Sequence, residues 1–350
     1  MTEILYSILT AFFITFFAIP SIIRIALEKK LYDEPGERHS HTQIIPTLGG
    51  IGIFAGIIFS FTFWLPFDHY NPAETDIKYV LSSYIIIFLI GAKDDIVPLP
   101  AYKKIIGQIA AAFILVKYAN VKLSSLYGIF GVSEIPEILS IVLSVFTIVV
   151  IINAFNLIDG INGLAATIGI LSCAIFGYWF YEDGRMDMAI IATSTIGSLI
   201  AFLYYNAKNK IFMGDTGSLL IGITAAILAI NFIESNHHVH DGWVIKSVPA
   251  VAIAILIIPL FDTLRVFVIR AIKGKSPFDA DKNHIHHLLL SLNFSHLEST
   301  IILAIVNIIF VVLAYNLMFL GTMYLIFIVF GLASVLTGLL FLRVNAKKQI

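Results

Sequence analysis

Long runs of apolar residues constrain this chain more than any other feature. A helix of about 20 apolar residues spans the hydrocarbon core of a bilayer. Only 13% of the 350 residues are charged, against about 25% in soluble domains. Eleven such runs are found, at 4–25, 47–66, 78–92, 105–120, 138–155, 163–181, 188–205, 217–233, 247–270, 298–316 and 322–341. The sequence therefore predicts an all-α, polytopic integral membrane protein with about 11 transmembrane helices, forming one domain over residues 1–350.

The distribution of basic residues predicts the orientation. Arg24, Lys29 and Lys30 follow the first apolar run, and an acidic residue, Glu3, precedes it. If the N-terminus lies outside, 17 of the 22 lysines and arginines fall in cytoplasmic loops or the C-terminus, and 5 fall outside. Lysine and arginine are enriched on the cytoplasmic side of membrane proteins. We therefore expect an outer N-terminus and a cytoplasmic C-terminus.

The unusual polar residues fall in loops that this orientation places on the cytoplasmic face. These loops are 26–50, 91–104, 153–164, 206–218 and 271–290. Ion-coupled transporters usually carry charged groups near the bilayer midplane. Inside the apolar runs, ionisable residues are almost absent. The clear exception is Asp262, whose charge Arg265 can neutralise from three residues away. The pattern favours a reaction between a cytosolic solute and a molecule dissolved in the membrane.

The second loop carries two adjacent carboxylates, Asp94 and Asp95, at the end of an apolar run. Adjacent carboxylates repel each other unless a cation is near. Oxygen-only ligation suits Mg²⁺, which is typically held by one or two carboxylates and by substrate phosphates. The alternative is a helix that ends in water, with Lys93 as the partner of the pair.

The third loop, FNLIDGINGLAAT, places polar groups at every third position. These groups are Asn153, Asn156, Asp159 and Asn162. On a helix end they form one polar stripe, and the nearby glycines let backbone approach a ligand. A polar turn between two helices needs only one or two such groups as caps. We therefore favour a ligand site over a simple turn.

The last two loops add a further carboxylate and a group of histidines. Asp215 precedes an apolar run and follows Phe212, so the pair predicts a metal or phosphate site with a stacking surface, or else only an N-cap. The fifth loop carries His284, His286 and His287. Their spacing is not a usual zinc pattern, and no cysteine joins them. With neighbouring lysines they fit anion binding, the alternative being a solvated basic loop. The outer histidines, including His237, receive no role.

Taken together, three acidic loops, glycine-opened helix starts and a basic histidine loop on one face predict a magnesium–diphosphate site. Metal and basic groups there would neutralise phosphate charge in the transition state.

Six motifs in order now resemble a known family. They are DEPGERHSHTQIIPTLGG, GAKDD, NAFNLIDGINGLA, FMGDTGSL, PLFDTLRV and HIHHLL. They are similar to those of the polyprenyl-phosphate N-acetylhexosamine-1-phosphate transferases, in glycosyltransferase family 4. The short histidine loop resembles the branch that uses UDP-N-acetylglucosamine.

The resemblance implies a reaction, a cofactor and a location. Undecaprenyl phosphate would attack the β-phosphorus of UDP-N-acetylglucosamine, giving undecaprenyl-diphospho-N-acetylglucosamine and UMP. The resemblance implies Mg²⁺, or Mn²⁺, as the cofactor. The enzyme would lie in the bacterial inner membrane with its site facing the cytoplasm. Its partners would be a UDP-N-acetyl sugar and a polyprenyl phosphate lipid, with no nucleic acid; a homodimer is left open.

The resemblance also implies residue roles. Asp94 would be the base or the partner of the lipid phosphate, supported by Asp95, and Asp159 would be a third catalytic carboxylate. Asp215 would bind the metal, with Asp95 beside it. The implied substrate-binding residues are His41, Asn156, Asn162, Phe212, His284, His286 and His287.

One departure from the family and two rival functions stay open. Many members read DGIDG where this chain reads DGING, so Asn162 can hydrogen-bond a sugar or uracil but cannot be a charged ligand. The sugar could accordingly be a different UDP-N-acetyl sugar. A transporter of nucleotide sugars or lipid-linked sugars would use similar phosphate-binding residues. A metal hydrolase would need the histidines to hold zinc.

Overall fold

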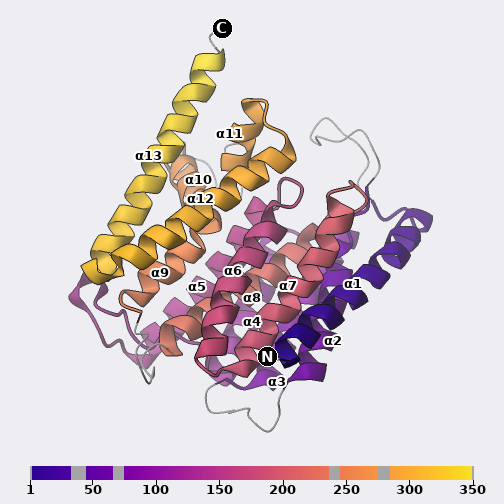
Figure 1. The fold of residues 1–350 in the computed structure, drawn as a ribbon, viewed down its shortest axis with the longest axis horizontal. Helices are drawn as coiled ribbons and strands as arrows, with labels where there is room; N and C mark the ends of the chain where they lie inside the picture. Colours follow the sequence, from indigo (N-terminus) through magenta and orange to yellow (C-terminus); the bar gives the residue numbers. More distant parts are fainter. Residues whose placement is uncertain (1, 33–44, 66–74, 236–244, 275–283, 349–350) are drawn as a thin grey trace.

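The computed structural model describes residues 2–32, 45–65, 75–235, 245–274 and 284–348. These residues form a helical bundle, and the only strand-like pairings among them are isolated bridges at Tyr32–Pro46 and Ser125–Glu134. Figure 1 shows the N-terminus near the lower end of the bundle and α13 rising beside α11 to the C-terminus at the top. The helices are α1 (Thr2–Glu28), α2 (Gly49–Trp64), α3 (Ile77–Ile96), α4 (Ala101–Tyr118), η2 (Ile129–Gly131), α5 (Glu137–Ile158), α6 (Leu164–Glu182), α7 (Met186–Asn206), α8 (Gly214–Ser235), α9 (Val248–Ile255), α10 (Ile257–Ile272), α11 (Ile285–Ser291), α12 (His296–Leu317), η3 (Met318–Leu320) and α13 (Thr322–Lys348).

The helices confirm a polytopic membrane protein. Within the described ranges, seven helices are long and apolar enough to cross a membrane, or eight if α9 and α10 count as one span. The helix α2 has 16 residues, and charged residues lie near the ends of α3 and α4. The total of eleven spans and the orientation stay predictions.

The run 247–270 is not one straight helix, because α9 and α10 meet at an angle of 84°. Pro259 explains the break. Proline has no N–H to donate to the carbonyl four residues earlier. That carbonyl belongs to Ile255, and it accepts a hydrogen bond from Asn307 Nδ2 of α12 at 3.2 Å instead. A buried carbonyl in a membrane protein needs such a replacement partner.

The helix α8 lies in the middle of the bundle. Its sequence is apolar on all sides, as expected for a helix surrounded by others. Of the residues in its most apolar 18-residue stretch, 94% are buried. Gly222 lets α8 approach α5, because a Cβ there would lie 2.6 Å from the Cα of Ile152. The first turn of this central helix carries Asp215 to one end of the bundle.

Small and hydroxyl residues join α1, α2 and α7. The hydroxyls of Ser7 and Thr193 lie 2.7 Å apart, and Ser60 donates to the carbonyl of Ser7 at 2.7 Å. A Cβ at Gly56 would collide with Thr15. Small residues allow helices to pack closely in a bilayer, where no hydrophobic effect drives them together. This packing fixes α2, whose first residues reach the candidate site.

A polar clamp closes the other end of the bundle. Arg185 forms two contacts with the carboxylate of Asp187, at 3.1 and 3.2 Å, and also donates to Ser235 at 3.0 Å and Thr75 at 3.1 Å. These residues come from the start of α7, the end of α8 and the start of α3. The clamp therefore fixes α8 at the end opposite its first turn.

Candidate active site

The first turn of α8 is held by the segment that precedes α2. Phe212 N–H donates to the carbonyl of Pro46 at 2.8 Å, and Gly49 N–H donates back to Phe212 at 3.0 Å. Gly50 has no room for a side chain, because a Cβ there would collide with the amide of Gly217. The PTLGG and FMGD motifs, about 160 residues apart, therefore form one structural unit.

Asp95 caps α8 from a neighbouring helix. Its Oδ1 accepts from the amide of Asp215 at 2.7 Å, and its Oδ2 accepts from the amide and hydroxyl of Thr216 at 3.0 and 2.5 Å. The first amides of a helix lack partners inside the helix, so such acceptors stabilise it. Asp95 lies beyond the predicted span 78–92. Burial raises its pKa to about 7, although the hydrogen bonds from Thr216 and Asp215 favour the charged form.

Lys104 joins two of the predicted site carboxylates. Its ammonium lies 2.7 Å from Asp94 Oδ2 and 2.7 Å from Asp215 Oδ2. The other oxygen of Asp94 accepts from the amide of Leu99 at 2.6 Å. Burial works against the charge of Lys104, but Asp215 and Asp94 outweigh it and raise the pKa of the amine. A positive charge therefore lies between carboxylates from α3 and α8.

Two residues of the polar stripe predicted in the third loop, Asn156 and Asn153, contact different helices. Asn156 donates to Asp215 Oδ1 at 3.0 Å and to the hydroxyl of Ser218 at 2.9 Å. Asn153 instead pairs with Gln108 of α4, donating to it at 2.6 Å. Asn156 thus belongs to the carboxylate cluster, while Asn153 holds α5 against α4.

Asp159 ends α5 and lies at the same end of the bundle. Its carboxyl group is half-buried and has no hydrogen-bond or ion-pair partner among the described residues. Burial, together with the negative charges of Asp215 and Asp95, raises its pKa well above the usual value. Asp159 is therefore a carboxyl group that can hold a proton in this site.

Asn162 takes part in local contacts beside the carboxylates. Its side chain donates to Asn209 in the turn between α7 and α8. Its carbonyl accepts from Thr300 of α12 at 3.1 Å, and its amide donates to His296 at 3.4 Å. The position that departs from the DGIDG pattern therefore links this loop to α12.

Two of the three predicted histidines are buried, and each packs against a different element. His284 Nδ1 lies 2.8 Å from Asp262 Oδ2. His286 packs on Gly160, where a Cβ would collide with its Nε2. Burial, aided by His287, lowers the pKa of His286 to about 3, so its ring is neutral. His287 is half-buried. The histidine segment therefore meets the Asp159 loop, although His286 is not a cation there.

Of two further predicted substrate-binding residues, the structure describes Phe212 but not His41. Phe212 is half-buried, and so less open than a free stacking surface. His41 lies in 33–44, outside the described residues. The two ends of that segment are joined by the bridge between Tyr32 and Pro46, beside the FMGD unit.

The donor set around Lys104 fits a hard divalent cation. Carboxylate oxygens of Asp94 and Asp215 both lie 2.7 Å from the Lys104 ammonium, so a divalent cation bound by them would take the place of that positive charge; oxygen donors suit Mg²⁺. No group of three or more His, Cys, Asp or Glu side chains in the described part of the chain could hold a metal alone. A cation there would therefore take part of its coordination from substrate phosphates or water, as Mg²⁺ usually does.

Sequence reasoning placed Lys104 in the loop 91–104 but gave it no role, and it did not select Gln108 or the Asp262–His284 contact. Lys104 and Gln108 are separated by one helical turn on α4, which places both toward the polar residues of α3, α5 and α8. That spacing was the available signal. The partner of Asp262 could not be read from spacing, because 22 residues separate it from His284.

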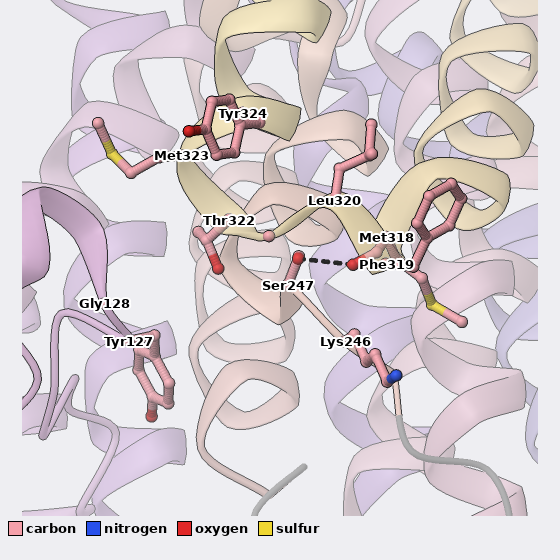
Figure 2. Close-up of a pocket in the computed structure, with 11 residues that line it drawn as sticks. Tyr127, Gly128, Lys246, Ser247, Met318, Phe319, Leu320, Thr322, Met323 and Tyr324 are labelled. Atoms are coloured by element: carbon pink, nitrogen blue, oxygen red, sulfur yellow. Dashed lines mark hydrogen bonds between the residues drawn. The ribbon is translucent and has the colours of Figure 1, made fainter.

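The cleft drawn in Figure 2 lies elsewhere. It measures about 530 Å³ and is lined by residues around Tyr127, Ser247 and Thr322. Tyr127 bonds to Glu234 at the far end of α8, and Ser247 donates to the carbonyl of Met318 at 2.7 Å. None of the predicted site residues lines this cleft. The chemistry is therefore assigned to the carboxylate end.

Comparisons with known proteins identify the family of the chain. The model of glycosyl transferase family 4 matches residues 77–233, from α3 to α8. A probable undecaprenyl-phosphate N-acetylglucosaminyl 1-phosphate transferase of Bacillus subtilis is 31% identical over 311 residues, which are 87% of this chain and 81% of that protein. The chain belongs to glycosyl transferase family 4.

Other relatives of this family 4 chain carry closely similar names. The undecaprenyl-phosphate alpha-N-acetylglucosaminyl 1-phosphate transferase of Shigella flexneri is 30% identical over 288 residues, covering 81% of this chain and 75% of the relative. The protein of the same name from Yersinia pestis is 28% identical over 312 residues, covering 87% and 80%. The family named from the sequence motifs is thereby confirmed.

Proposed function

We propose that this chain transfers N-acetylglucosamine 1-phosphate from UDP-N-acetylglucosamine to undecaprenyl phosphate, releasing UMP. The observation that carries the proposal is the contact of Lys104 with both Asp94 and Asp215, at the end of the bundle where the GAKDD and FMGD motifs meet. The names of the relatives supply the substrates. The cluster of Asp94, Lys104 and Asp215 supports a site for phosphate and metal at that end.

The proposed reaction requires the two substrates to be positioned and their phosphate charge to be neutralised, more than it requires the lipid phosphate to be activated as a nucleophile. A phosphate monoester has a second pKa of about 6, so the lipid phosphate is largely ionised at neutral pH. One of its oxygens attacks the β-phosphorus of the nucleotide sugar. The bond from that phosphorus to the bridging oxygen breaks, and UMP leaves with the oxygen. Asp94 is the proposed partner or base for the lipid phosphate. Asp159, with its raised pKa, can donate a hydrogen bond to a phosphate oxygen.

The proposed metal is Mg²⁺, with Mn²⁺ as a substitute. Asp215 is the proposed ligand, and Asp94 faces the same position. Asp95 was predicted as a second ligand. Since its oxygens accept three hydrogen bonds from α8, we assign it to holding Asp215 in place. When bound, the cation would neutralise charge on the diphosphate.

The proposed topology has eleven spans, an outer N-terminus and a site that faces the cytoplasm of a bacterial inner membrane. Lys93, Lys103 and Lys104 lie in the loop nearest the carboxylates, whereas Arg185 lies at the opposite end. That asymmetry agrees with the preference of basic residues for the cytoplasmic side. The site is then open to a cytosolic nucleotide sugar and to a lipid in the bilayer.

The test follows UMP release by purified protein in detergent with undecaprenyl phosphate, Mg²⁺ and UDP-N-acetylglucosamine. We expect UMP that depends on the lipid and on the metal. Asp94→Asn should abolish most of it, while Asp187→Asn, at the opposite end, is the matched carboxylate control. UMP from UDP-N-acetylgalactosamine alone would change the assigned sugar. No UMP from any UDP-sugar by folded protein would overturn the proposal.

A further inference from the structure

The histidine segment 284–291 depends on contacts with other parts of the bundle for its position. It contains one short helix, α11, and it follows the undescribed residues 275–283. The N-cap residue His284 makes no side-chain cap bond to α11 itself. The first amide of the helix therefore needs an acceptor from elsewhere.

Asp262 of α10 supplies that acceptor. Its Oδ1 accepts from the amide of Ile285 at 3.0 Å, and its Oδ2 lies 2.8 Å from His284 Nδ1. Arg265 also donates to Oδ1 at 3.0 Å. The side chain of Asp262 is only 2% exposed. Both of its oxygens are thus used, and one side chain fixes both the backbone and the ring at the start of the segment.

Contacts continue from His284 to the candidate site. The rings of His284 and His286 are stacked, with centroids 5.5 Å apart and planes 8° apart. His286 packs against Gly160, the residue after Asp159. Its Nε2 is buried and has no hydrogen-bond partner among the described residues. A displacement at Asp262 would therefore move an imidazole that lies on the catalytic loop.

Neutralising Arg265 does not by itself account for Asp262. A buried ion pair gains little over well-packed apolar residues, because removing both charges from water is costly. The pair could also be satisfied within α10, since the two residues are three apart. The additional bonds to His284 and Ile285 are what connect α10 to the histidine segment.

We propose that Asp262 is a positioning residue, which holds the segment 284–291 so that His286 remains against Gly160 beside Asp159. Its effect on the reaction rests on the proposed function, whereas its effect on the segment does not. The family resemblance implies that the histidines lie where the nucleotide and diphosphate would bind, so losing Asp262 should weaken use of the nucleotide sugar. Use of the lipid should change little.

The first experiment measures hydrogen exchange of the full-length protein in detergent. Asp262→Asn should raise the exchange rate of the peptide containing Ile285, because the amide loses its charged acceptor. Asp187→Asn is the matched control, since it also removes a buried carboxylate paired with an arginine. It should leave that peptide unchanged. Equal protection of the peptide in both variants would overturn the proposal, whether or not the protein has the proposed activity.

The second experiment measures UMP release at varied substrate concentrations. Asp262→Asn should raise the KM for the UDP-sugar about tenfold or more, the scale on which losing the hydrogen-bond partner of a metal-binding histidine lowers affinity or activity. The KM for the lipid should stay within about twofold, since the acceptor's proposed partner, Asp94, is untouched. Asp262→Glu should recover part of the loss. A general structural defect would change both KM values and would not be restored by glutamate.

A double variant tests whether Asp262 acts through His284. The loss in Asp262→Asn with His284→Gln should be close to that of either single variant, because both remove the same contact. If the two losses added, Asp262 and His284 would act independently, and the proposal that Asp262 acts through His284 would be overturned. If Asp262→Asn does not fold, His284→Gln alone still tests the exchange of the Ile285 peptide, since it removes one of the two bonds.

Discussion

Variants of the cap that Asp95 forms on α8 should lose stability according to the number of hydrogen bonds that each removes. Three bonds meet its carboxylate, from the amides of Asp215 and Thr216 and from the hydroxyl of Thr216. Asp95→Ala removes all three. Asp95→Asn keeps one accepting oxygen but turns an NH₂ group toward an amide donor. Thr216→Val removes only the hydroxyl bond, with little change in shape.

The expected losses follow from the number of bonds removed. A hydrogen bond contributes about 1 kcal/mol net to stability, and an N-cap side chain contributes about 1 kcal/mol in typical helices. Asp95→Ala should therefore cost about 3 kcal/mol, Asp95→Asn about 2 kcal/mol and Thr216→Val about 1 kcal/mol. The three variants should rank in that order.

Cys173 provides the assay. It is the only cysteine in the chain and is 1% exposed, so a thiol-reactive dye reports its exposure on unfolding. Midpoints of thermal unfolding in detergent should fall in the predicted order. Because the cap is made of protein groups alone, the order should be the same in Mg²⁺ and in EDTA. A wild-type midpoint for Asp95→Ala in EDTA would refute the cap, and differences that appear only with Mg²⁺ would indicate a metal ligand instead.

Three other predictions concern charge at and away from the site. Asp215→Ala and Asp94→Asn should each lower UMP release about 100-fold or more, the scale for removing an electrostatic or acid–base group; wild-type turnover would contradict that residue's assignment. Lys104→Gln should lower the unfolding midpoint more in EDTA than in Mg²⁺, because the divalent cation replaces the lost charge between the carboxylates. An equal loss in both would count against a shared cation position. His237→Ala, outside the described residues, should keep turnover within about twofold, since its loop was assigned to the outer face; a large loss would contradict that assignment.

The sequence predicted the helices well, because an apolar run of bilayer length has few alternatives. It also predicted that polar residues from separate loops lie at one end of the bundle, while their role in catalysis stays a prediction. Asp95 accepts from the amide of Asp215, Lys104 joins Asp94 to Asp215, and Asp159 lies close enough to Asp215 and Asp95 for their charges to raise its pKa. Motif order and a common face were sufficient for this result.

The contacts within the site could not be predicted in the same way. The bond between Asp95 and Asp215 spans 120 residues, and it depends on Gly91 letting α3 approach α8. A pattern of residue types does not specify that approach. The bend between α9 and α10 differs, because Pro259 was a visible signal in the run 247–270. The hydrogen bond from Asn307 that accompanies the bend depends on the tertiary structure.

The caps formed across helices have a consequence for biosynthesis. Asp95 lies before α8 in the chain, and Asp262 lies before α11. During translation, each acceptor is therefore made before the helix start that it stabilises. The acidic half of the site has all its parts once α8 has been synthesised, whereas the histidine segment is added later from a separate stretch. A chain truncated after α8 would carry every carboxylate of the candidate centre but no part of the histidine segment.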